Sequence, residues 1–95
     1  MRLRLTPLAL RDFEHLHYFE TLNFGVRQAD DYLLGLLSTF DTIAAEPLAV
    51  APRYEVHPPL RLRPHGAHHI LYHIADDHVL ILRVLHRSAN WGDWL

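Results

Sequence analysis

The chain of 95 residues contains no cysteine and no lysine. Without cysteine, neither a disulfide framework nor a thiolate zinc site can form, thiol redox chemistry is excluded, and a reducing cytoplasm is the expected compartment. No stretch approaches the roughly 20 apolar residues needed to cross a bilayer, and residues 1–10, MRLRLTPLAL, alternate Arg with Leu instead of forming a signal-peptide core. The sequence therefore predicts a cytoplasmic protein with no membrane association.

Positive charge is also scarce. All nine basic residues are arginine, and eleven acidic residues give a formal net charge of −2 with histidine neutral. Because binding to phosphate depends on Lys and Arg charge, direct nucleic-acid binding is not expected. The charges are unevenly spread, since residues 51–95 hold five Arg and seven His against four acidic residues. We therefore expect an acidic or anionic partner to dock on the C-terminal half.

The first half of the chain predicts a strand and two helices. Its length and its 49% apolar residues fit one core, so one domain over residues 1–95 is expected. RLRL at residues 2–5 alternates with period 2, and Thr6 followed by Pro7 forms a helix start. NFG separates this helix, which runs to about Leu22, from a second one ended by Pro47, so an antiparallel helical hairpin is expected. The predicted buried stripes comprise Ala9, Phe13, Leu16, Phe19 or Glu20, Val26, Ala29, Leu33, Leu36, Leu37, Phe40 and Ile43.

The second half predicts strands. RYEVH at residues 53–57 and LRLR at residues 60–63 flank two prolines and predict one interrupted edge strand or two short ones. HHILYHIA and HVLILRVLH are clearer strands, and the Asp76-Asp77 pair between them predicts a tight antiparallel hairpin. The order β-α-α-β-β-β predicts an α+β fold, with the helical hairpin packed on one face of a small, mainly antiparallel sheet.

These elements carry a family pattern. The N-terminal strand, TPLALRDF, a second helix that opens after NFG and closes at AAEP, LRLR and the final hairpin together resemble the ParE toxins of the RelE/ParE toxin superfamily. The resemblance covers essentially the whole chain. Its most specific part is the final hairpin, where Ile70, Tyr72 and Ile74 precede an acidic turn and the strand ILRVLH at residues 81–86.

The resemblance implies a bacterial type II toxin, held inactive in a hetero-oligomer by a small ParD-like antitoxin whose C-terminal segment wraps the toxin. It implies inhibition of DNA gyrase, which ParE toxins trap during DNA cleavage, with no cofactor. RelE-type relatives with the same fold instead cut mRNA on the ribosome, and the fold alone does not choose between the two. The lack of lysine and the negative net charge favour gyrase, because docking on ribosomal RNA needs many basic contacts.

Histidine placement follows from the register of the predicted hairpin. Counting back from the two-residue turn pairs His73 with Leu80, His69 with Val84, and Ala67 with His86. The sheet face expected to pack on the helices carries Ile70, Tyr72, Ile74, Val79, Ile81, Arg83 and Leu85. The histidines His69, His73 and His86 then share the opposite, less covered face.

The positions of these histidines bear on two possible roles, metal binding and catalysis. His69 and His73 lie about 13 Å apart on a strand, too far to share an ion through Zn–N bonds of about 2.0 Å, so no metal site is predicted. A gyrase inhibitor needs no catalytic residue. If the protein is instead an mRNA endonuclease, His69 and His86 are the expected acid and base, because they lie diagonally across the hairpin.

The remaining candidates are contact residues. Arg83 lies between apolar neighbours on the helix side, which predicts an ion pair with an acid such as Asp12 or Glu55. The tail WGDWL is expected either to fold back as a lid or to expose its tryptophans as an anchor, since Trp and Arg are enriched at interface hot spots. Asn90 stands where the family commonly has Asp, which puts any role for a carboxylate there in doubt. The candidate contacts with antitoxin or target are Arg61, Arg63, His69, His73, His86, Arg87, Trp91 and Trp94.

Overall fold

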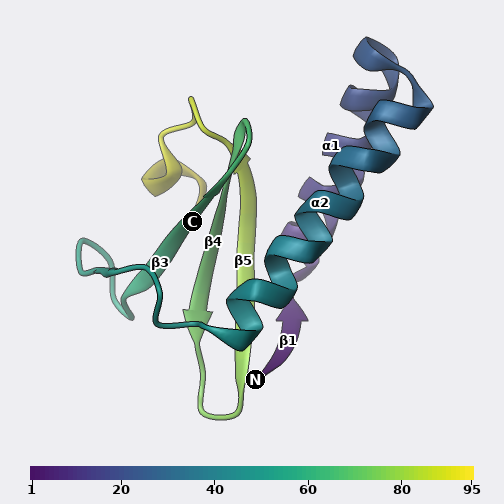
Figure 1. Ribbon diagram of the computed structural model, residues 1–95. Coiled ribbons are helices and arrows are strands. Elements are labelled where there is room, and N and C mark those ends of the chain that lie inside the picture. The colour runs from purple at the N-terminus through teal and green to yellow at the C-terminus, as the bar shows by residue number, and fades with distance from the viewer.

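The computed structural model describes residues 1–95, in which a helical hairpin covers one face of a five-stranded sheet (Figure 1). The sheet order is β1-β5-β4-β3-β2, antiparallel except for the parallel pair of β1 and β5. The predicted α+β fold and order of elements are confirmed. The elements are β1 (Arg2–Leu5), α1 (Pro7–Phe24), α2 (Val26–Ala45), β2 (Pro52–Arg53), β3 (Leu60–His65), β4 (His68–Ile74), β5 (His78–His86) and the 3₁₀ helix η1 (Trp91–Trp94).

Local sequence signals set the ends of both long helices. The Thr6 hydroxyl caps α1 by accepting a 3.0 Å hydrogen bond from the Ala9 N–H. Gly25, with φ of 87°, ends α1 and starts α2, because a positive φ is open to glycine at little cost. The second helix ends at Ala45, two residues before Pro47. Neither helix is long and apolar enough to span a bilayer.

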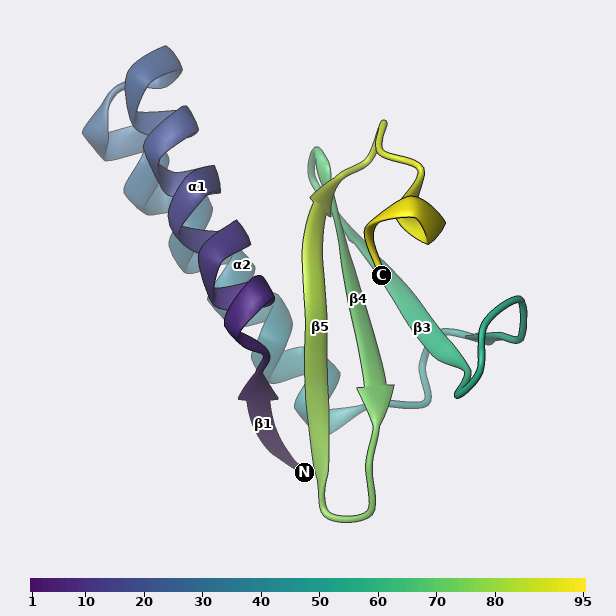
Figure 2. The ribbon, with the colours of Figure 1, turned by 180° about the vertical axis from the view of Figure 1, so that it is seen from behind.

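The helical hairpin diverges from the sheet toward its α1–α2 turn (Figures 1 and 2). Apolar residues near the turn therefore have no sheet to pack against, and Val26 is 62% exposed. The predicted burial of Val26 is wrong for this reason, and that of Leu37 is wrong because this residue is 43% exposed on the outer side of α2. Of the two residues suggested for the end of the α1 stripe, Glu20 is buried and Phe19 is exposed.

Apolar clusters lie on both faces of the sheet. The larger one fills the space between the sheet and the helices, and it comprises Ala9, Leu16, Leu36, Phe40, Ile43, Ile70, Tyr72, Val79, Ile81 and Val84. The smaller one, which we call the far-face cluster, comprises Leu60, Leu71 and Leu85. No α-helix covers the far face, and this cluster is shielded by Val56 from the loop before β3, by Leu82 of β5 and by Trp91 of the C-terminal segment.

The turn end of the β4–β5 hairpin has the predicted register. The Ala75 N–H donates a 2.9 Å hydrogen bond to the His78 carbonyl oxygen. His73 pairs with Leu80, as expected from counting back from the turn.

A β-bulge then shifts the register by one residue. Tyr72 pairs with Ile81, whereas Leu71 pairs with Arg83, so Leu82 has no partner on β4. Such a bulge inserts one extra residue into one strand and disrupts the alternation of its side chains. The sequence contains no glycine or proline that would have marked this position.

The predicted pairs beyond the bulge are wrong. His69 pairs with Leu85 instead of Val84, and His86 pairs with His68 instead of Ala67. Because a slip of one residue exchanges the two faces of a strand, Val84 packs on the helices and Leu85 joins the far-face cluster. His86 is consequently on the helix face.

The predicted strand over residues 53–57 is wrong except at its first residue. β2 contains only Pro52 and Arg53, and Tyr54 is 76% exposed. Two prolines follow closely and cannot donate ladder hydrogen bonds, which keeps this edge short. The strand predicted at residues 60–63 is present as β3 and continues to His65.

Candidate functional site

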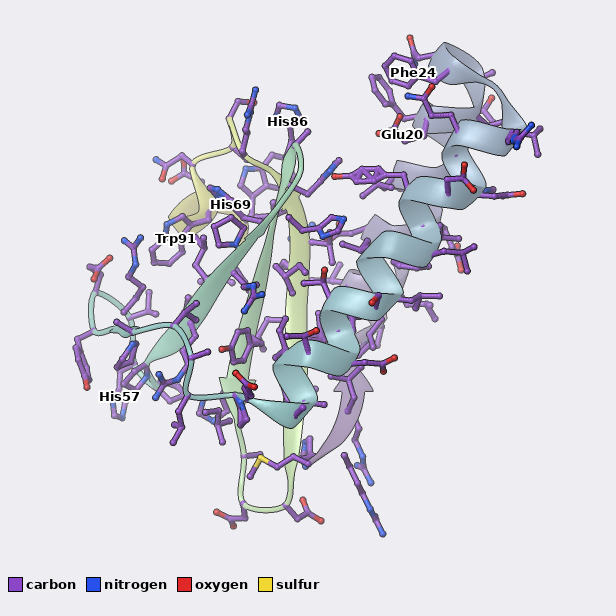
Figure 3. The ribbon with its side chains drawn as sticks, in the orientation of Figure 1. Glu20, Phe24, His57, His69, His86 and Trp91 are labelled. Atoms are coloured by element: carbon purple, nitrogen blue, oxygen red, sulfur yellow. The ribbon has the colours of Figure 1, made fainter.

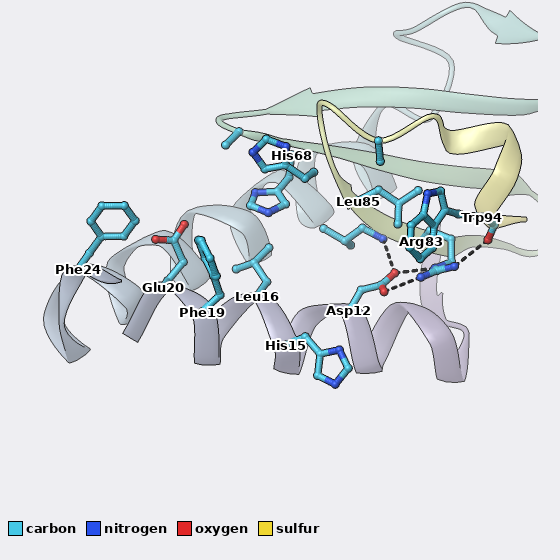
Figure 4. A pocket seen from close by; sticks show the side chains of 14 residues that line it. Asp12, His15, Leu16, Phe19, Glu20, Phe24, His68, Arg83, Leu85 and Trp94 are labelled. Atoms are coloured by element: carbon cyan, nitrogen blue, oxygen red, sulfur yellow. Dashed lines mark hydrogen bonds and ion pairs between the residues drawn. The ribbon is translucent and has the colours of Figure 1, made fainter. Parts of the chain in front are cut away.

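A groove runs between α1 and the second half of β5 (Figure 4). It exists because β1 ends at Leu5, which pairs with Ile81, so no strand covers the outer edge of β5 after that point. The groove has a volume of about 570 Å³, and eight of its 14 lining residues are hydrophobic. We call it the α1–β5 groove, and its lining residues are Asp12, His15, Leu16, Phe19, Glu20, Phe24, Ala67, His68, Arg83, Val84, Leu85, His86, Ala89 and Trp94.

Arg83 ties α1, β5 and the C-terminal segment together at one end of the groove. Its Nε and Nη2 donate to the two carboxylate oxygens of Asp12 at 2.7 Å each, and its Nη1 donates to the Trp94 carbonyl oxygen at 2.7 Å. Asp12 also accepts the Val84 N–H at 3.0 Å, on the edge that β1 leaves uncovered. The hydrogen bonds with Asp12 raise the pKa of Arg83. Of the two acids named from the sequence, Asp12 is therefore the partner of Arg83, and Glu55 pairs elsewhere.

Two histidines contact Tyr32 where the β3–β4 turn meets α2, and a third histidine contacts one of them. The Tyr32 hydroxyl lies 2.7 Å from His68 Nδ1 and 3.1 Å from the His65 carbonyl oxygen, and it accepts the Ala67 N–H at 3.2 Å. The Tyr32 ring stacks on His65 with 5.4 Å between centroids, and His68 meets His86 edge to face at 5.6 Å. We call Tyr32, His65, His68 and His86 the histidine cluster. Two of its members, His68 and His86, also line the α1–β5 groove.

Burial keeps His68 uncharged at neutral pH. Its pKa is lowered to about 4, first by burial and then by the nearby His86, His65 and His69. Burial and the charge of Arg63 also lower the pKa of His65. Consequently His68 adds no positive charge to the groove at neutral pH.

Gly66 brings the histidine cluster together. Its φ is 53°, and a Cβ at this position would lie 2.8 Å from the Tyr32 hydroxyl oxygen. Only glycine satisfies both the backbone conformation and the close approach. No group of three or more His, Cys, Asp or Glu side chains, including this cluster, is arranged to hold a metal ion.

Comparison with known proteins gives the family. The chain matches the family model described as "ParE toxin of type II toxin-antitoxin system, parDE" over residues 3–91. The chain belongs to the ParE toxin family. It is also 32% identical over 87 residues to Toxin ParE1 of Caulobacter vibrioides, a match that covers 92% of this chain and 90% of that protein. This toxin is thus a ParE-like member of the RelE/ParE superfamily, as its sequence resemblance implied.

Solved structures agree with this fold. The toxin resembles a chain of the chromosomal ParDE toxin–antitoxin system of P. aeruginosa with a TM-score of 0.77 and 16% identity, over 90% of this chain and 95% of that one. It resembles a chain of the RelBE2 toxin–antitoxin complex of Mycobacterium tuberculosis with a TM-score of 0.67 and 26% identity, over 93% and 92% of the two chains. The first likeness, at this identity, concerns the fold alone.

Of the three histidines predicted to lie on the less covered face, His69 and His73 lie on the far face and His86 does not (Figure 3 labels His69 and His86). His69 is on the far face, where its pair residue Leu85 joins the far-face cluster. His73 Nδ1 lies 3.2 Å from the Pro59 carbonyl oxygen. His86 belongs to the histidine cluster on the helix face, so the predicted acid and base, His69 and His86, are not brought together.

The three arginines predicted as partner contacts lie in two places, Arg61 and Arg63 on β3 and Arg87 just after β5. Arg61 pairs with Tyr72, which places it on the helix face of β3, and it donates a hydrogen bond to the Val50 carbonyl oxygen. Arg63 is two residues further along the same face, and Arg87 is exposed just after β5. Neither Arg63 nor Arg87 forms an ion pair. The guanidinium groups of Arg63 and Arg87 therefore remain free to meet anionic groups of a partner.

The two tryptophans in the C-terminal segment of the toxin have different environments. Trp91 is partly buried and packs against the far-face cluster, as a lid would. Trp94 is 53% exposed, lines the α1–β5 groove and lies 5.7 Å from the guanidinium carbon of Arg83. Of the two tryptophans, Trp94 is the one with an open aromatic surface.

Tyr32, His65 and His68 are not among the site residues predicted from the sequence. The available signal is HGAHH, in which Gly66 between two strand patterns indicates a turn that brings His65 opposite His68. No local pattern indicates that α2 carries Tyr32 to this turn. Glu20 is anticipated only as one of two residues for the buried stripe of α1, and its burial depends on how closely α1 approaches β5.

Proposed function

We propose that this toxin inhibits DNA gyrase and is neutralised by a ParD-like antitoxin, with which it forms a hetero-oligomer in the cytoplasm. In this proposal residues 1–95 act as one toxin domain, without an enzymatic step, a cofactor or a membrane contact. Membership of the ParE family and the 32% identity to Toxin ParE1 support it.

The separation of His69 from His86 is the observation that favours gyrase inhibition over mRNA cleavage. A nuclease that uses an acid and a base needs both side chains within hydrogen-bond reach of the reacting atoms, so both must reach the same bound substrate. The bulge at Leu82 puts the two histidines on opposite faces of the sheet. The most buried arginine near them, Arg83, is already paired with Asp12.

Charge supports the same choice. Ribosomal RNA binding draws on many Lys and Arg contacts to phosphate, whereas the toxin has no lysine and a formal net charge of −2. His68 stays neutral at neutral pH because its pKa is about 4. A protein target such as gyrase does not require a basic surface of that size.

The α1–β5 groove supports an antitoxin partner. It is open, largely apolar and bordered by Phe19 and Phe24, which are 59% and 53% exposed. Exposed aromatic side chains beside a groove are typical of sites that receive the apolar face of a partner segment. We propose that a segment of the antitoxin lies in this groove.

Two assays on the purified toxin test the proposal. DNA supercoiling by gyrase is expected to fall, and cleaved DNA is expected to accumulate, while mRNA in a translating extract stays intact. Co-expression with a small protein encoded beside the toxin is expected to relieve the inhibition. Intact gyrase activity together with cut mRNA would overturn the proposal.

The 26% identity to a chain of the RelBE2 complex and the position of His86 beside His68 favour mRNA cleavage as the second candidate function. For that function, His86→Ala is expected to lower the rate of mRNA cleavage by about 10² to 10⁴ through lost proton transfer. For gyrase inhibition, the same change is expected to leave supercoiling inhibition within about twofold.

A further inference from the structure

Glu20 is a buried acidic residue in the wall of the α1–β5 groove. It is only 8% exposed and is the one charged residue among the 15 buried residues of the protein. It lies four residues after Leu16, on the buried face of α1. Figure 4 shows its carboxylate turned toward the groove, with Phe19 and Phe24 on either side of it along the helix.

The Glu20 carboxylate has no partner within the chain. The four ion pairs of the protein join other residues, and no hydrogen bond is drawn to Glu20 among the groove residues (Figure 4). Every fully shielded side-chain oxygen or nitrogen in the protein has a hydrogen-bond partner. The oxygens of Glu20 therefore keep some open surface, and that surface faces the groove.

Neither the arginine nor the half-buried histidine of the groove neutralises Glu20. The guanidinium of Arg83 is held by Asp12 at the other end of the groove. The pKa of His68 is lowered to about 4 by burial, so this ring is neutral at neutral pH. Burial, together with the charge of Glu20, raises the pKa of the Tyr32 hydroxyl, which places that charge close to a neutral phenol.

A buried charge without a counter-charge destabilises a protein, so its retention points to a positively charged ligand. The neighbouring rings indicate which cation fits. Phe19 and Phe24 are both more than half exposed, at 59% and 53%. A guanidinium stacks on aromatic rings while donating two parallel hydrogen bonds to a carboxylate, whereas an ammonium is a compact, strongly hydrated point charge.

We propose that Glu20 anchors an arginine-binding subsite in the α1–β5 groove. An arginine of an apolar segment from a protein partner pairs with the Glu20 carboxylate and packs against Phe19 and Phe24. The subsite rests on the proposed function only in naming that partner as the antitoxin. It defines one required residue of the partner segment, an arginine flanked by apolar side chains.

Two small probes test the subsite without the partner. Phenylguanidinium carries the head group of arginine on an apolar ring, and phenylurea has a similar shape without the charge. In NMR titrations of the full-length toxin, phenylguanidinium is expected to shift the Phe19 and Phe24 signals with an affinity about tenfold higher than that of phenylurea. Glu20→Gln is expected to abolish this preference. Glu14→Gln, at an exposed carboxylate of the same helix, is expected to preserve it.

Equal affinity for the two probes, or a preference that survives Glu20→Gln, overturns the proposal. Thermal unfolding of the same variants separates ligand binding from a structural role. Glu20→Gln is expected to keep or raise the midpoint of unfolding, because it removes a buried charge. A lower midpoint indicates a partner for Glu20 inside the fold and also overturns the proposal.

The partner is tested separately. If the small protein encoded beside the toxin binds it, Glu20→Gln is expected to weaken that affinity at least tenfold, and Glu14→Gln to leave it within about twofold. Unchanged affinity in Glu20→Gln overturns the subsite as an antitoxin contact. Because the probe titrations need neither gyrase nor antitoxin, a toxin that does not inhibit gyrase overturns the proposed function and leaves the subsite standing.

Discussion

The carboxylate of Asp12 in α1 and the guanidinium of Arg83 in β5 form an ion pair through two hydrogen bonds of 2.7 Å. The two side chains are only 13% and 11% exposed. The pair lies beyond the end of β1, where the outer edge of β5 has no neighbouring strand, and Asp12 also accepts the Val84 N–H there. A single carboxylate thus holds α1 against a sheet edge that no backbone ladder covers.

Removal of the Asp12 charge is expected to destabilise the protein. Asp12→Asn should lower the free energy of unfolding by about 2–4 kcal/mol, because Arg83 is left nearly buried without a counter-charge. Urea unfolding followed by circular dichroism measures this loss. Asp31→Asn, at an exposed carboxylate of α2, should change the same free energy by less than about 0.5 kcal/mol. Equal effects of the two changes would mean that the ion pair does not stabilise the fold.

His68 is expected to make stability depend on pH. Its pKa is about 4 in the folded protein, below the ordinary value of 6.5, so between these values the unfolded chain binds a proton that the folded chain does not. The contribution of a neutral His68 is therefore complete above about pH 6.5 and declines as the pH falls toward about 4, by about 1–2 kcal/mol once its partial exposure is allowed for.

Urea unfolding at a series of pH values checks this dependence. His68→Gln should flatten the profile between about pH 6.5 and pH 4, because glutamine binds no proton. His15→Gln, at an exposed position on α1, is the control and should leave the profile unchanged. A profile of His68→Gln that matches the original protein would exclude His68 as the source.

Substitution of Gly66 is expected to disturb the histidine cluster. Gly66→Ala should lower the free energy of unfolding by about 2–3 kcal/mol, because it combines a positive φ with a Cβ placed 2.8 Å from the Tyr32 hydroxyl. Gly25→Ala is a comparison in which only the backbone is strained, since φ of 87° with ψ of 164° is open almost only to glycine and nothing lies within 4 Å of the added Cβ, and it should cost about 1–3 kcal/mol. The contact itself is measured by thermal unfolding in a Tyr32→Phe background, where Gly66→Ala should cost less because the hydroxyl is absent, and an equal loss in both backgrounds would contradict the contact.

Substitution of the two tryptophans is expected to have different effects on stability and on gyrase inhibition. Trp91→Ala should lower the free energy of unfolding by about 1–3 kcal/mol, because it uncovers the far-face cluster. Trp94→Ala should change it by less than about 1 kcal/mol, since only an exposed contact with Arg83 is lost. If Trp94 meets gyrase, its removal should weaken the inhibition of supercoiling at least tenfold. The reverse order of stability losses would show that the roles are exchanged.

The elements of this fold could be predicted because their signals are local. Period-2 alternation marks β3, β4 and β5, and the cap at Thr6 and the proline at position 47 mark the outer ends of the helical hairpin. The family could also be predicted from the sequence of the final hairpin, and the match to the family model over residues 3–91 agrees with it. Such signals depend on residues within one turn or a few strand positions of each other.

The candidate site could be predicted only in part, because its residues meet across long stretches of chain. The alternation in β5 gives no sign of the bulge at Leu82, which lies directly after the last residue of β5 that pairs with β1. That one residue moves His86 from the far face to the histidine cluster, which removes the predicted acid–base pair.

By itself the sequence determined the type and order of the elements, the family and the need of Arg83 for an acidic partner. The tertiary structure decided that this partner is Asp12, 71 positions away, that Tyr32 meets His65 and His68, and that Glu20 and not Phe19 is buried in the groove wall. The sequence signals for periodicity and capping lie within each element or within a few residues of its ends. Register, the choice of an ion-pair partner and the burial of a charge depend on packing between elements that are distant in the chain.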